Sequence, residues 1–362
     1  MRIGVLRERM TGERRVALIP DSVARLTKGG FEVRVERDAG LAAGFPDALY
    51  TTAGATISPD ASTAADADLV LAVRRPDAER VAALREGTVL VALLQPASAG
   101  ELPGQLAARR VRGLSLEKVP RITKAQSMDV LSSQSTVAGY KAALIGAAEL
   151  GKLLPMLTTA AGTLAPAKAF ILGAGVAGLQ AIATTRRLGA IVSAFDIRPA
   201  AREQVQSLGA SFVASEAVSQ DAETAGGYAR QQTEDEQART MATIGRHIVD
   251  QDLVITTALI PGRPAPRLIT ADMVHGMRPG AVIVDLAAEA GGNCELTRPD
   301  ETVTINGVTI LGPTNLPSTV PLHASQMFSR NLETLIKHLA PDGSLSLDEN
   351  DEIVKAMLLS SS

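Results

Sequence analysis

Residues 167–196, with the sequence AKAFILGAGVAGLQAIATTRRLGAIVSAFD, decide the fold class. An apolar run at 167–172 predicts a buried strand, and the segment 176–188, which follows a short glycine-rich turn, has the composition of a helix. A second apolar run at 191–195 predicts another strand. Because strand, helix and strand in this order form a βαβ unit, we expect the two strands to lie parallel in one sheet.

The turn between the first strand and the helix has the pattern G-x-G-x-x-G, formed by Gly173, Gly175 and Gly178. The first glycine allows a tight turn, the second has no Cβ to obstruct a pyrophosphate, and the third lets helix and strand pack closely. The helix N-terminus at Val176 offers unpaired N–H groups and a positive dipole end to phosphates. The pattern predicts a dinucleotide site, and the alternative is a glycine-rich turn that binds nothing.

Asp196 ends the second strand 18 residues after Gly178, where an acidic side chain accepts the hydroxyls of an adenosine ribose. A carboxylate at this position repels a 2′-phosphate, so we expect NAD(H) to be preferred over NADP(H). Arg198 slightly weakens this preference, because an arginine nearby can accommodate the phosphate. Ile197, between these two residues, belongs to the same predicted site.

Thr257, Ala258 and Leu259 end a further predicted strand at 253–257. In a parallel sheet the carboxyl ends of the strands share one edge, so these residues are expected beside the glycine turn. Small residues there allow a dinucleotide to lie across the strand ends. A plain exit from strand to loop is the alternative.

Short apolar runs alternate with helical patterns along the rest of the chain as well. The runs at 69–73 and 89–94 lack polar alternation, as expected for strands covered on both faces of a parallel sheet. Long helical segments are predicted at 130–150 and 323–339. We therefore predict an α/β protein with two Rossmann-like, doubly wound parallel-sheet domains, linked by long helices and with a cleft between them.

The predicted domain organisation is discontinuous. Residues 1–130 and 320–350 form an N-terminal Rossmann-like domain, because the late helix carries the chain back to the first half. Residues 131–319 form the NAD(H)-binding Rossmann domain. Residues 351–362 are polar, lack a periodic pattern and are predicted to be a frayed tail.

Composition narrows the function. Among 362 residues, Lys and Arg total 36 and Asp and Glu total 39, and the net charge of −3 argues against a nucleic-acid partner. The single cysteine, Cys294, excludes an internal disulfide, and four scattered histidines argue against a metal site. The lack of a long uncharged apolar run argues against direct insertion into a membrane.

A polar segment at 121–134, RITKAQSMDVLSSQ, precedes the first long helix. Arg121 and Asp129 could pair, and Gln126 and Ser132 could bind a carboxamide, which is the group that nicotinamide presents. The alternative is structural, with Asp129 and Ser132 capping the helix and a solvated loop before it.

A second polar segment lies between Phe212 and Leu253. Loops of this length in a compact domain are usually functional or disordered. Gly227, in a Gly-Gly pair, is a candidate hinge, and Tyr228 is a candidate lid contact. A surface excursion with an exposed tyrosine is the alternative.

The first half of the chain contains no histidine. A dehydrogenase acting on an alcohol or amino acid moves a proton as well as a hydride, and needs a general acid or base. Hydride exchange between two nicotinamides needs only positioning and exclusion of water. The lack of a histidine in this half of the chain therefore favours hydride exchange between two nicotinamides.

Five segments resemble the NAD(H)-binding domain of proton-translocating NAD(P) transhydrogenases, as found in the soluble first portion of the alpha subunit of three-subunit bacterial enzymes. They are RITKAQSMDVLSSQS, TAAGTLAPAKAFILGAGVAGLQAIATTRRLGA, ETAGGYAR, ITTALIPGRPAPRLIT and VDLAAEAGGNCELT. The resemblance extends from about Arg2 to Leu339. It implies that this chain binds NADH and passes hydride to NADP⁺ held by a partner subunit, while a membrane-embedded subunit couples the transfer to proton translocation. It also implies a homodimer on the cytoplasmic face of the inner membrane, held there through its partners.

The resemblance assigns roles to individual residues. The loop that holds the nicotinamide end is matched by Arg121, Gln126, Asp129 and Ser132. Tyr228 matches the tyrosine of a mobile loop that closes on the cofactor. A chain that ends in a polar segment at Ser362 is expected to be a complete subunit.

Alanine dehydrogenases share this fold and provide the alternative. Their substrate-binding arginine matches Arg15, but their catalytic lysine and histidine fall at Arg74 and Gln95, and their pocket aspartate falls at Glu289. The proton-transferring pair is therefore missing, which argues against amino-acid oxidation. A non-catalytic NAD-binding module is the third possibility.

Overall fold

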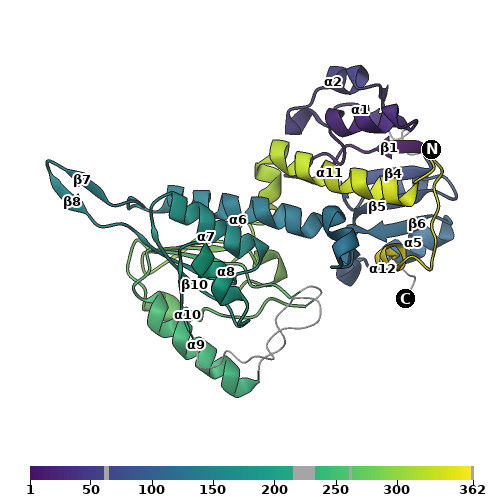
Figure 1. Ribbon diagram of the computed structural model, residues 1–362. Coiled ribbons are helices and arrows are strands. Elements are labelled where there is room, and N and C mark those ends of the chain that lie inside the picture. The colour runs from purple at the N-terminus through teal and green to yellow at the C-terminus, as the bar shows by residue number, and fades with distance from the viewer. Residues whose placement is uncertain (61–64, 215–232, 261–262, 360–362) are drawn as a thin grey trace. The chain divides into compact units, whose positions relative to one another are not determined.

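The computed structural model describes residues 1–60, 65–214, 233–260 and 263–359 (Figure 1). The chain forms two compact units. Unit 1 comprises Met1–Gln134 and Pro317–Ser362, and unit 2 comprises Ser135–Leu316. Each is built on a largely parallel sheet, which confirms the predicted α/β class with two parallel-sheet domains.

Unit 1 contains a six-stranded parallel sheet in the order β3-β2-β1-β4-β5-β6. The strands are β1 (Arg2–Val5), β2 (Glu32–Glu36), β3 (Thr56–Ser58), β4 (Leu69–Arg74), β5 (Val89–Leu93) and β6 (Arg112–Ser115). The α-helices are α1 (Pro20–Lys28), α2 (Asp47–Thr52), α4 (Ala78–Ala83), α5 (Leu102–Ala108), α11 (Pro321–Leu339) and α12 (Glu352–Met357). Short 3₁₀ turns are η1 (Leu41–Ala43), η2 (Pro96–Ser98), η3 (Leu116–Lys118), η4 (Thr123–Met128) and η6 (Leu316–Thr319).

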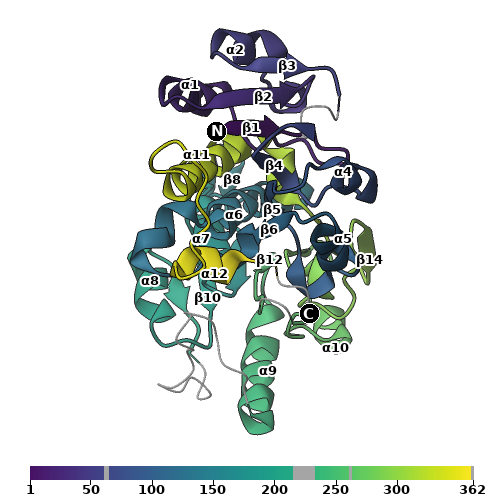
Figure 2. The same ribbon diagram turned by 90° about the vertical axis from the view of Figure 1, so that its right-hand side faces the viewer.

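The sheet of unit 1 is covered on both faces. Alternate residues of β4 point to opposite sides, so Leu71 joins a cluster with Phe328 and Leu332 of α11, while Val70 joins a cluster with Leu102 of α5. Figure 2 shows α11 on one side of β4 and β5 and α4 and α5 on the other. Burial on both faces explains why these strands are continuous apolar runs in the sequence.

The prediction of a frayed tail at 351–362 is wrong for its described residues, 351–359. Asp351 caps α12 by accepting the N–H groups of Ile353 and Val354 at 2.9 and 3.0 Å. Ile353, Val354 and Met357 are buried in the core of unit 1. The three buried residues lie on a helix of only six residues, and such a short pattern is hard to recognise among polar neighbours.

Unit 2 contains a seven-stranded sheet in the order β11-β10-β9-β12-β13-β15-β14. Its strands are β9 (Lys168–Leu172), β10 (Ile191–Phe195), β11 (Ser211–Phe212), β12 (Leu253–Thr256), β13 (Val282–Asp285), β14 (Thr302–Ile305) and β15 (Val308–Leu311). Its helices are α6 (Val130–Glu149), which begins in unit 1, α7 (Val176–Arg187), α8 (Ala201–Ser207), α9 (Glu234–Ile248) and α10 (Ala271–His275), with the 3₁₀ turn η5 (Ala288–Ala290).

Among the described strands of this sheet, only β14 runs antiparallel to its neighbour. Its turn to β15 is the pair Asn306-Gly307, both with positive φ, which is the favoured two-residue hairpin turn. In the same unit, Thr233 and Glu236 form the capping box of α9, with N–H hydrogen bonds of 2.8 and 3.3 Å. The spacing of this pair in the sequence is typical of such a cap.

Two glycines of α6 allow this helix to pack closely against α7 and β12. A Cβ on Gly139 would lie 2.0 Å from the carbonyl oxygen of Ala177, and one on Gly146 would lie 2.6 Å from the side chain of Leu253. The absence of side chains at Gly139 and Gly146 therefore lets α6 lie directly against α7 and β12. No described helix is both long and apolar enough to cross a bilayer.

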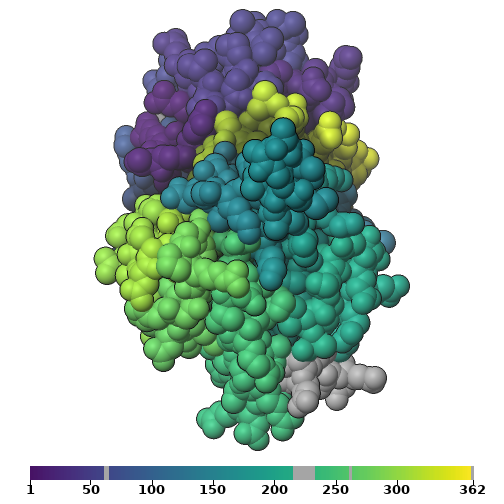
Figure 3. Space-filling model, turned by 90° about the vertical axis from the view of Figure 1, so that its left-hand side faces the viewer, coloured from purple at the N-terminus to yellow at the C-terminus, as the bar shows by residue number. Residues whose placement is uncertain are grey.

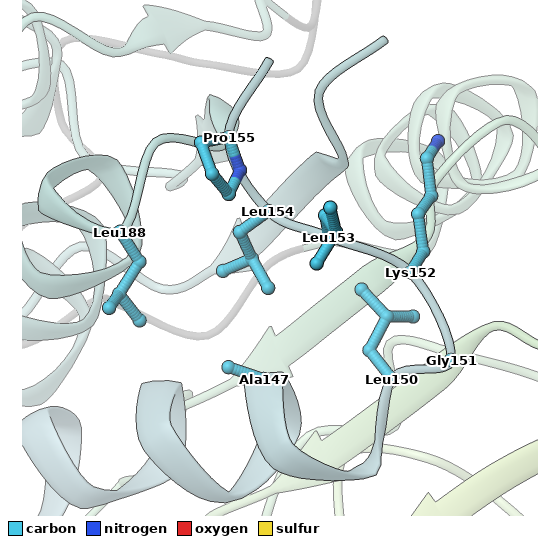
Figure 4. A pocket seen from close by; sticks show the side chains of 8 residues that line it. All are labelled: Ala147, Leu150, Gly151, Lys152, Leu153, Leu154, Pro155 and Leu188. Carbon is cyan, nitrogen blue, oxygen red and sulfur yellow. The ribbon is translucent and has the colours of Figure 1, made fainter. Parts of the chain in front are cut away.

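A two-stranded hairpin, β7 (Leu157–Thr159) and β8 (Gly162–Leu164), extends from unit 2. All six of its strand residues are exposed, including the cross-strand pair Leu157 and Leu164. Figure 3 views the molecule from the side on which the hairpin extends. At its base is an open, mainly apolar hollow of about 390 Å³ (Figure 4), lined by Ala147, Leu150, Gly151, Lys152, Leu153, Leu154, Pro155 and Leu188.

Candidate functional site

The three glycines of the turn after β9 differ in what surrounds them. Gly173 has φ +94°, and a Cβ there would lie 2.7 Å from Oγ1 of Thr257. A Cβ on Gly178 would lie 1.8 Å from the carbonyl oxygen of Gly173. A Cβ on Gly175 would meet no atom of the described residues within 4 Å. Thus Gly173 and Gly178 are required by the protein's own packing, whereas Gly175 borders open space.

This open space lies at the start of α7. Gly175 is the N-cap residue, and no side chain of the described residues caps this end of the helix. The first turn of α7 also contains no acidic side chain. The N–H groups of the first turn and the positive end of the helix dipole are therefore suited to an anion.

The strand end of β12 is fastened to the glycine turn. Thr257 donates its N–H to the carbonyl oxygen of Leu172 at 2.8 Å, and its hydroxyl to that of Gly173 at 3.1 Å. These bonds place Thr257 beside the glycine turn, at the strand end where residues 257–259 were expected. Leu259 and Val176 both have exposed apolar side chains at this edge of unit 2.

Asn293, which was not predicted from the sequence, fixes the segment after β12. Its Oδ1 accepts the N–H of Ala258 at 3.0 Å, and its Nδ2 donates to the carbonyl oxygen of Ala258 at 2.9 Å and to that of Pro266 at 2.8 Å. Asn293 is fully buried. Because the amide bonds both the N–H and the carbonyl oxygen of Ala258, it fixes the position of this residue's backbone. In the sequence, Asn293 could have been noticed through the loop AGGNC, which follows β13.

Asp285, which was also not predicted, shapes the loop that carries Asn293. The fully buried carboxylate accepts four hydrogen bonds of 2.7–3.0 Å, from Thr256 Oγ1, Ala287 N, Cys294 N and Thr297 Oγ1. These bonds satisfy the carboxylate inside the protein, so its role is structural. Burial raises the pKa of the Cys294 thiol, which disfavours the thiolate, the reactive form of a cysteine.

Asp196 contacts the glycine turn directly. Its Oδ2 accepts the N–H of Ala174 at 2.7 Å, which fixes the second residue of the turn. The carboxylate is also paired with Arg198, whose Nη2 lies 2.8 Å from Oδ2. The acid is only 7% exposed. The sequence suggests Arg198 as a partner of a phosphate, whereas its ion pair with Asp196 emerges only from the structure.

The residues assigned to the nicotinamide end belong to unit 1. Asp129 accepts both the N–H and the hydroxyl of Ser132, at 2.9 and 2.5 Å, directly before α6. The capping contact between these two residues, given above as the alternative, is therefore present. Arg121 and Gln126 are exposed on the segment that precedes it. Gly227 and Tyr228 lie outside the described residues.

Arg15 is engaged within unit 1. Its Nε and Nη2 donate to the two carboxylate oxygens of Glu13 at 2.8 and 2.7 Å, and its Nη1 donates to Gln134 Oε1 at 2.9 Å. Arg74 reaches the same carboxylate at 3.3 Å. Arg15 is only 2% exposed, and the buried carboxylate of Glu13 accepts hydrogen bonds from two of its nitrogens.

Glu8 lies beside this cluster. It accepts the N–H groups of Val73 and Arg74 at 2.7 and 3.2 Å, at the carboxyl end of β4. Burial, together with the nearby carboxylate of Glu13, raises the pKa of Glu8 to about 7. This carboxyl group therefore changes its charge near neutral pH.

Comparison with known proteins agrees with this geometry. Two domain families match the chain, the alanine dehydrogenase/PNT N-terminal domain at residues 4–138 and the alanine dehydrogenase/PNT C-terminal domain at residues 142–362. A protein of Rhodospirillum rubrum, named as the first portion of the alpha subunit of NAD(P) transhydrogenase, is 47% identical over 339 residues, covering 92% of this chain and 88% of that protein.

The chain is also similar to a solved transhydrogenase structure and, more distantly, to an alanine dehydrogenase. The transhydrogenase of Sinorhizobium meliloti has a TM-score of 0.91 at 44% identity, with 99% of this chain and 98% of that chain covered. An alanine dehydrogenase of Staphylococcus saprophyticus is 31% identical over 363 residues, covering 97% of this chain and 91% of that protein. The resemblance drawn from the sequence motifs is confirmed, and the chain belongs to the alanine dehydrogenase/PNT family.

Proposed function

We propose that this chain is the NAD(H)-binding subunit of a proton-translocating NAD(P) transhydrogenase. In this role it transfers hydride between NADH and NADP⁺ that a partner subunit binds. The observation that carries the proposal is the combination of a complete dinucleotide turn with the absence of a proton-transferring pair. Arg74 and Gln95 stand where alanine dehydrogenases have their catalytic lysine and histidine.

NAD(H) fits the residues of unit 2. The open space at Gly175 and the uncapped start of α7 suit the pyrophosphate. The carboxylate of Asp196 suits the adenosine-ribose hydroxyls, with Ile197 and Arg198 beside it. Thr257, Ala258 and Leu259 provide the surface across the strand ends, where the bonds of Asn293 hold the backbone in place.

We assign the nicotinamide end to Arg121, Gln126, Asp129 and Ser132, with Gly227 and Tyr228 in a closing loop. Ser132 donates its hydroxyl hydrogen to Asp129, and a hydroxyl oxygen can also accept a hydrogen bond, which is what a carboxamide N–H offers. Gln126 offers both a donor and an acceptor to the same group. When bound, the nicotinamide supplies the hydride, and these side chains orient its ring and exclude water.

Hydride transfer between two nicotinamides changes no O–H or N–H bond, so it needs no general acid or base. This explains how the chain functions without the lysine and histidine of its distant relatives. Arg15, which matches the substrate-binding arginine of alanine dehydrogenases, is paired here with the buried Glu13. An alanine dehydrogenase and a non-catalytic NAD-binding module are the alternatives.

Partner subunits belong to this function, one that binds NADP(H) and one embedded in the membrane. The location is then the cytoplasmic face of the membrane, reached through these partners. We also propose a homodimer that uses the hairpin β7–β8. Two-stranded hairpins are marginal in water, and this one exposes Met156, Leu157 and Leu164, so a second copy is a suitable surface for it to pack on.

The function is tested with the purified chain in three assays. Calorimetric titrations compare NADH with NADPH, a second assay supplies L-alanine and NAD⁺, and a third supplies NADH with an NADP⁺-loaded partner domain of a transhydrogenase. We expect selective NADH binding, no alanine oxidation, and hydride transfer only with the partner. Alanine oxidation by the chain alone would establish the dehydrogenase instead. NADH binding without transfer to any partner would leave a binding module.

A further inference from the structure

The carboxylate of Asp196 is saturated with hydrogen bonds from its own chain. Oδ1 accepts the backbone N–H and the Nε of Arg198 at 2.8 and 2.9 Å. Oδ2 accepts the N–H of Ala174 and the Nη2 of Arg198 at 2.7 and 2.8 Å. A carboxylate offers about four lone-pair positions, and these four bonds use them all. The ribose hydroxyls therefore compete with a group that is already in place.

Two of the four donors belong to the side chain of Arg198 rather than to the backbone. The N–H groups of Ala174 and Arg198 belong to the backbone of the turn and of the strand end, and Asp196 orders both segments. The guanidinium of Arg198 is on a long side chain that is 18% exposed, so it can rotate toward solvent. Its departure vacates one position on each carboxylate oxygen, which matches the two hydroxyls of a ribose.

We propose that Arg198 is the specificity-determining gate of the adenosine-ribose site, a proposal that rests on the NAD(H) function above. Without cofactor it pairs with Asp196, and it leaves when the ribose hydroxyls bind. The displaced guanidinium then stands as a positive charge near the 2′ position. The pairing of Arg198 with Asp196 lowers the affinity for NADH, because a bidentate ion pair must break when the ribose binds. The displaced guanidinium raises the affinity for NADPH, because it offers a partner to the 2′-phosphate.

Two variants and a matched control distinguish the effect of the positive charge of Arg198 from the effect of its bidentate contact with Asp196. Arg198→Gln removes both the charge and the bidentate contact, whereas Arg198→Lys keeps the charge without the planar fork. Arg202→Gln makes the same change of charge nearby, at an arginine whose guanidinium lies 4.9 Å from the ring centre of Phe212. Dissociation constants for NADH and NADPH are measured by calorimetry at one salt concentration, and circular dichroism verifies the fold of each variant.

We expect Arg198→Gln to bind NADH about three- to tenfold more tightly and NADPH at least about threefold more weakly than the parent. Arg198→Lys should bind NADH more tightly while it keeps the parent's affinity for NADPH. Arg202→Gln should match the parent for both cofactors. In an Asp196→Asn background, Arg198→Gln should no longer increase the affinity for NADH, because the pair it breaks is absent.

The opposite results would contradict the proposed role of Arg198. If Arg198→Gln binds NADH as the parent does, or more weakly, the guanidinium does not compete with the ribose. An equal loss of both cofactors would make Arg198 a support of the site rather than its gate. Failure of the proposed function looks different, because the parent chain itself would then bind neither cofactor, oxidise L-alanine, or transfer no hydride to the NADP⁺-loaded partner domain.

Discussion

Asn293 bonds both the N–H and the carbonyl oxygen of Ala258, across 35 residues of sequence. The bond pair fixes the backbone where β12 leaves the sheet, next to the glycine turn. The polar groups involved are fully or partly buried, so the loss of the amide leaves them without compensation.

Replacement of Asn293 by alanine should therefore affect both stability and binding. We expect the free energy of unfolding to fall by about 1–3 kcal/mol, and the affinity for NADH to fall as the strand end loosens. Urea unfolding and calorimetry measure the two effects. Asn350→Ala, at an exposed asparagine, is the control and should change neither. An unchanged affinity in Asn293→Ala would mean that this segment does not contact the cofactor.

The glycines of the turn provide a matched pair of variants. Gly178→Ala places a Cβ 1.8 Å from the carbonyl oxygen of Gly173, so it should destabilise the fold by about 1–3 kcal/mol or more. The new Cβ of Gly175→Ala meets nothing within 4 Å among the residues that the structure describes, so the stability of this variant should equal that of the parent. Its affinity for NADH should nevertheless fall about tenfold or more, because the methyl group occupies the space for the pyrophosphate. Normal NADH binding by Gly175→Ala would exclude this position from the site.

Asp196→Ala should weaken NADH binding with little change in the fold. The variant loses an acceptor for the ribose hydroxyls, which corresponds to about a 10–100-fold loss of affinity. The loss of the bond to Ala174 N contributes a small decrease in melting temperature. A variant that bound NADH as tightly as the parent would remove the role assigned to this acid.

Glu8 predicts a pH dependence of stability. Its pKa in the folded protein, about 7, lies above the ordinary value of 4.5, so the folded state binds this proton more tightly than the unfolded state does. The stabilisation is complete below pH 4.5 and is lost as the pH rises through about 7. Glu8→Gln keeps a neutral group beside Glu13 and Arg15, so it should be more stable than the parent at pH 8, by roughly 1–3 kcal/mol, and similar to it at pH 5. Chemical denaturation at the two pH values measures this difference. Equal pH profiles for parent and variant would contradict it.

The hairpin predicts the assembly state. Leu157→Lys combined with Leu164→Lys should convert a dimer into a chain of 37.7 kDa in sedimentation analysis, because the exposed apolar pair is the proposed contact. Leu41→Lys changes an equally exposed leucine of unit 1 and should leave the dimer intact. A dimer that persists in the double variant would place the contact elsewhere.

The sequence alone determined the features that depend on neighbouring residues. Alternation and apolar runs predict the strands, and the length and helical composition of two segments predict α6 and α11. The spacing of Thr233 and Glu236 predicts a capping box. These signals are local because backbone hydrogen bonds, caps and turns involve residues a few positions apart. For the same reason, the strand, glycine turn and helix at Gly173 could be predicted completely.

Only the tertiary structure decided which polar groups meet across the sheets. The Asn293–Ala258 and Arg15–Gln134 contacts join residues 35 and 119 positions apart, and the order of the strands brings them together. The burial of α12 similarly depends on the core surface that unit 1 presents. Even the Arg198–Asp196 pair, only two residues apart, required the side-chain positions, because the same arginine could equally have pointed to solvent. Local patterns specify the elements, whereas the partners of buried polar groups are set by the packing of distant segments.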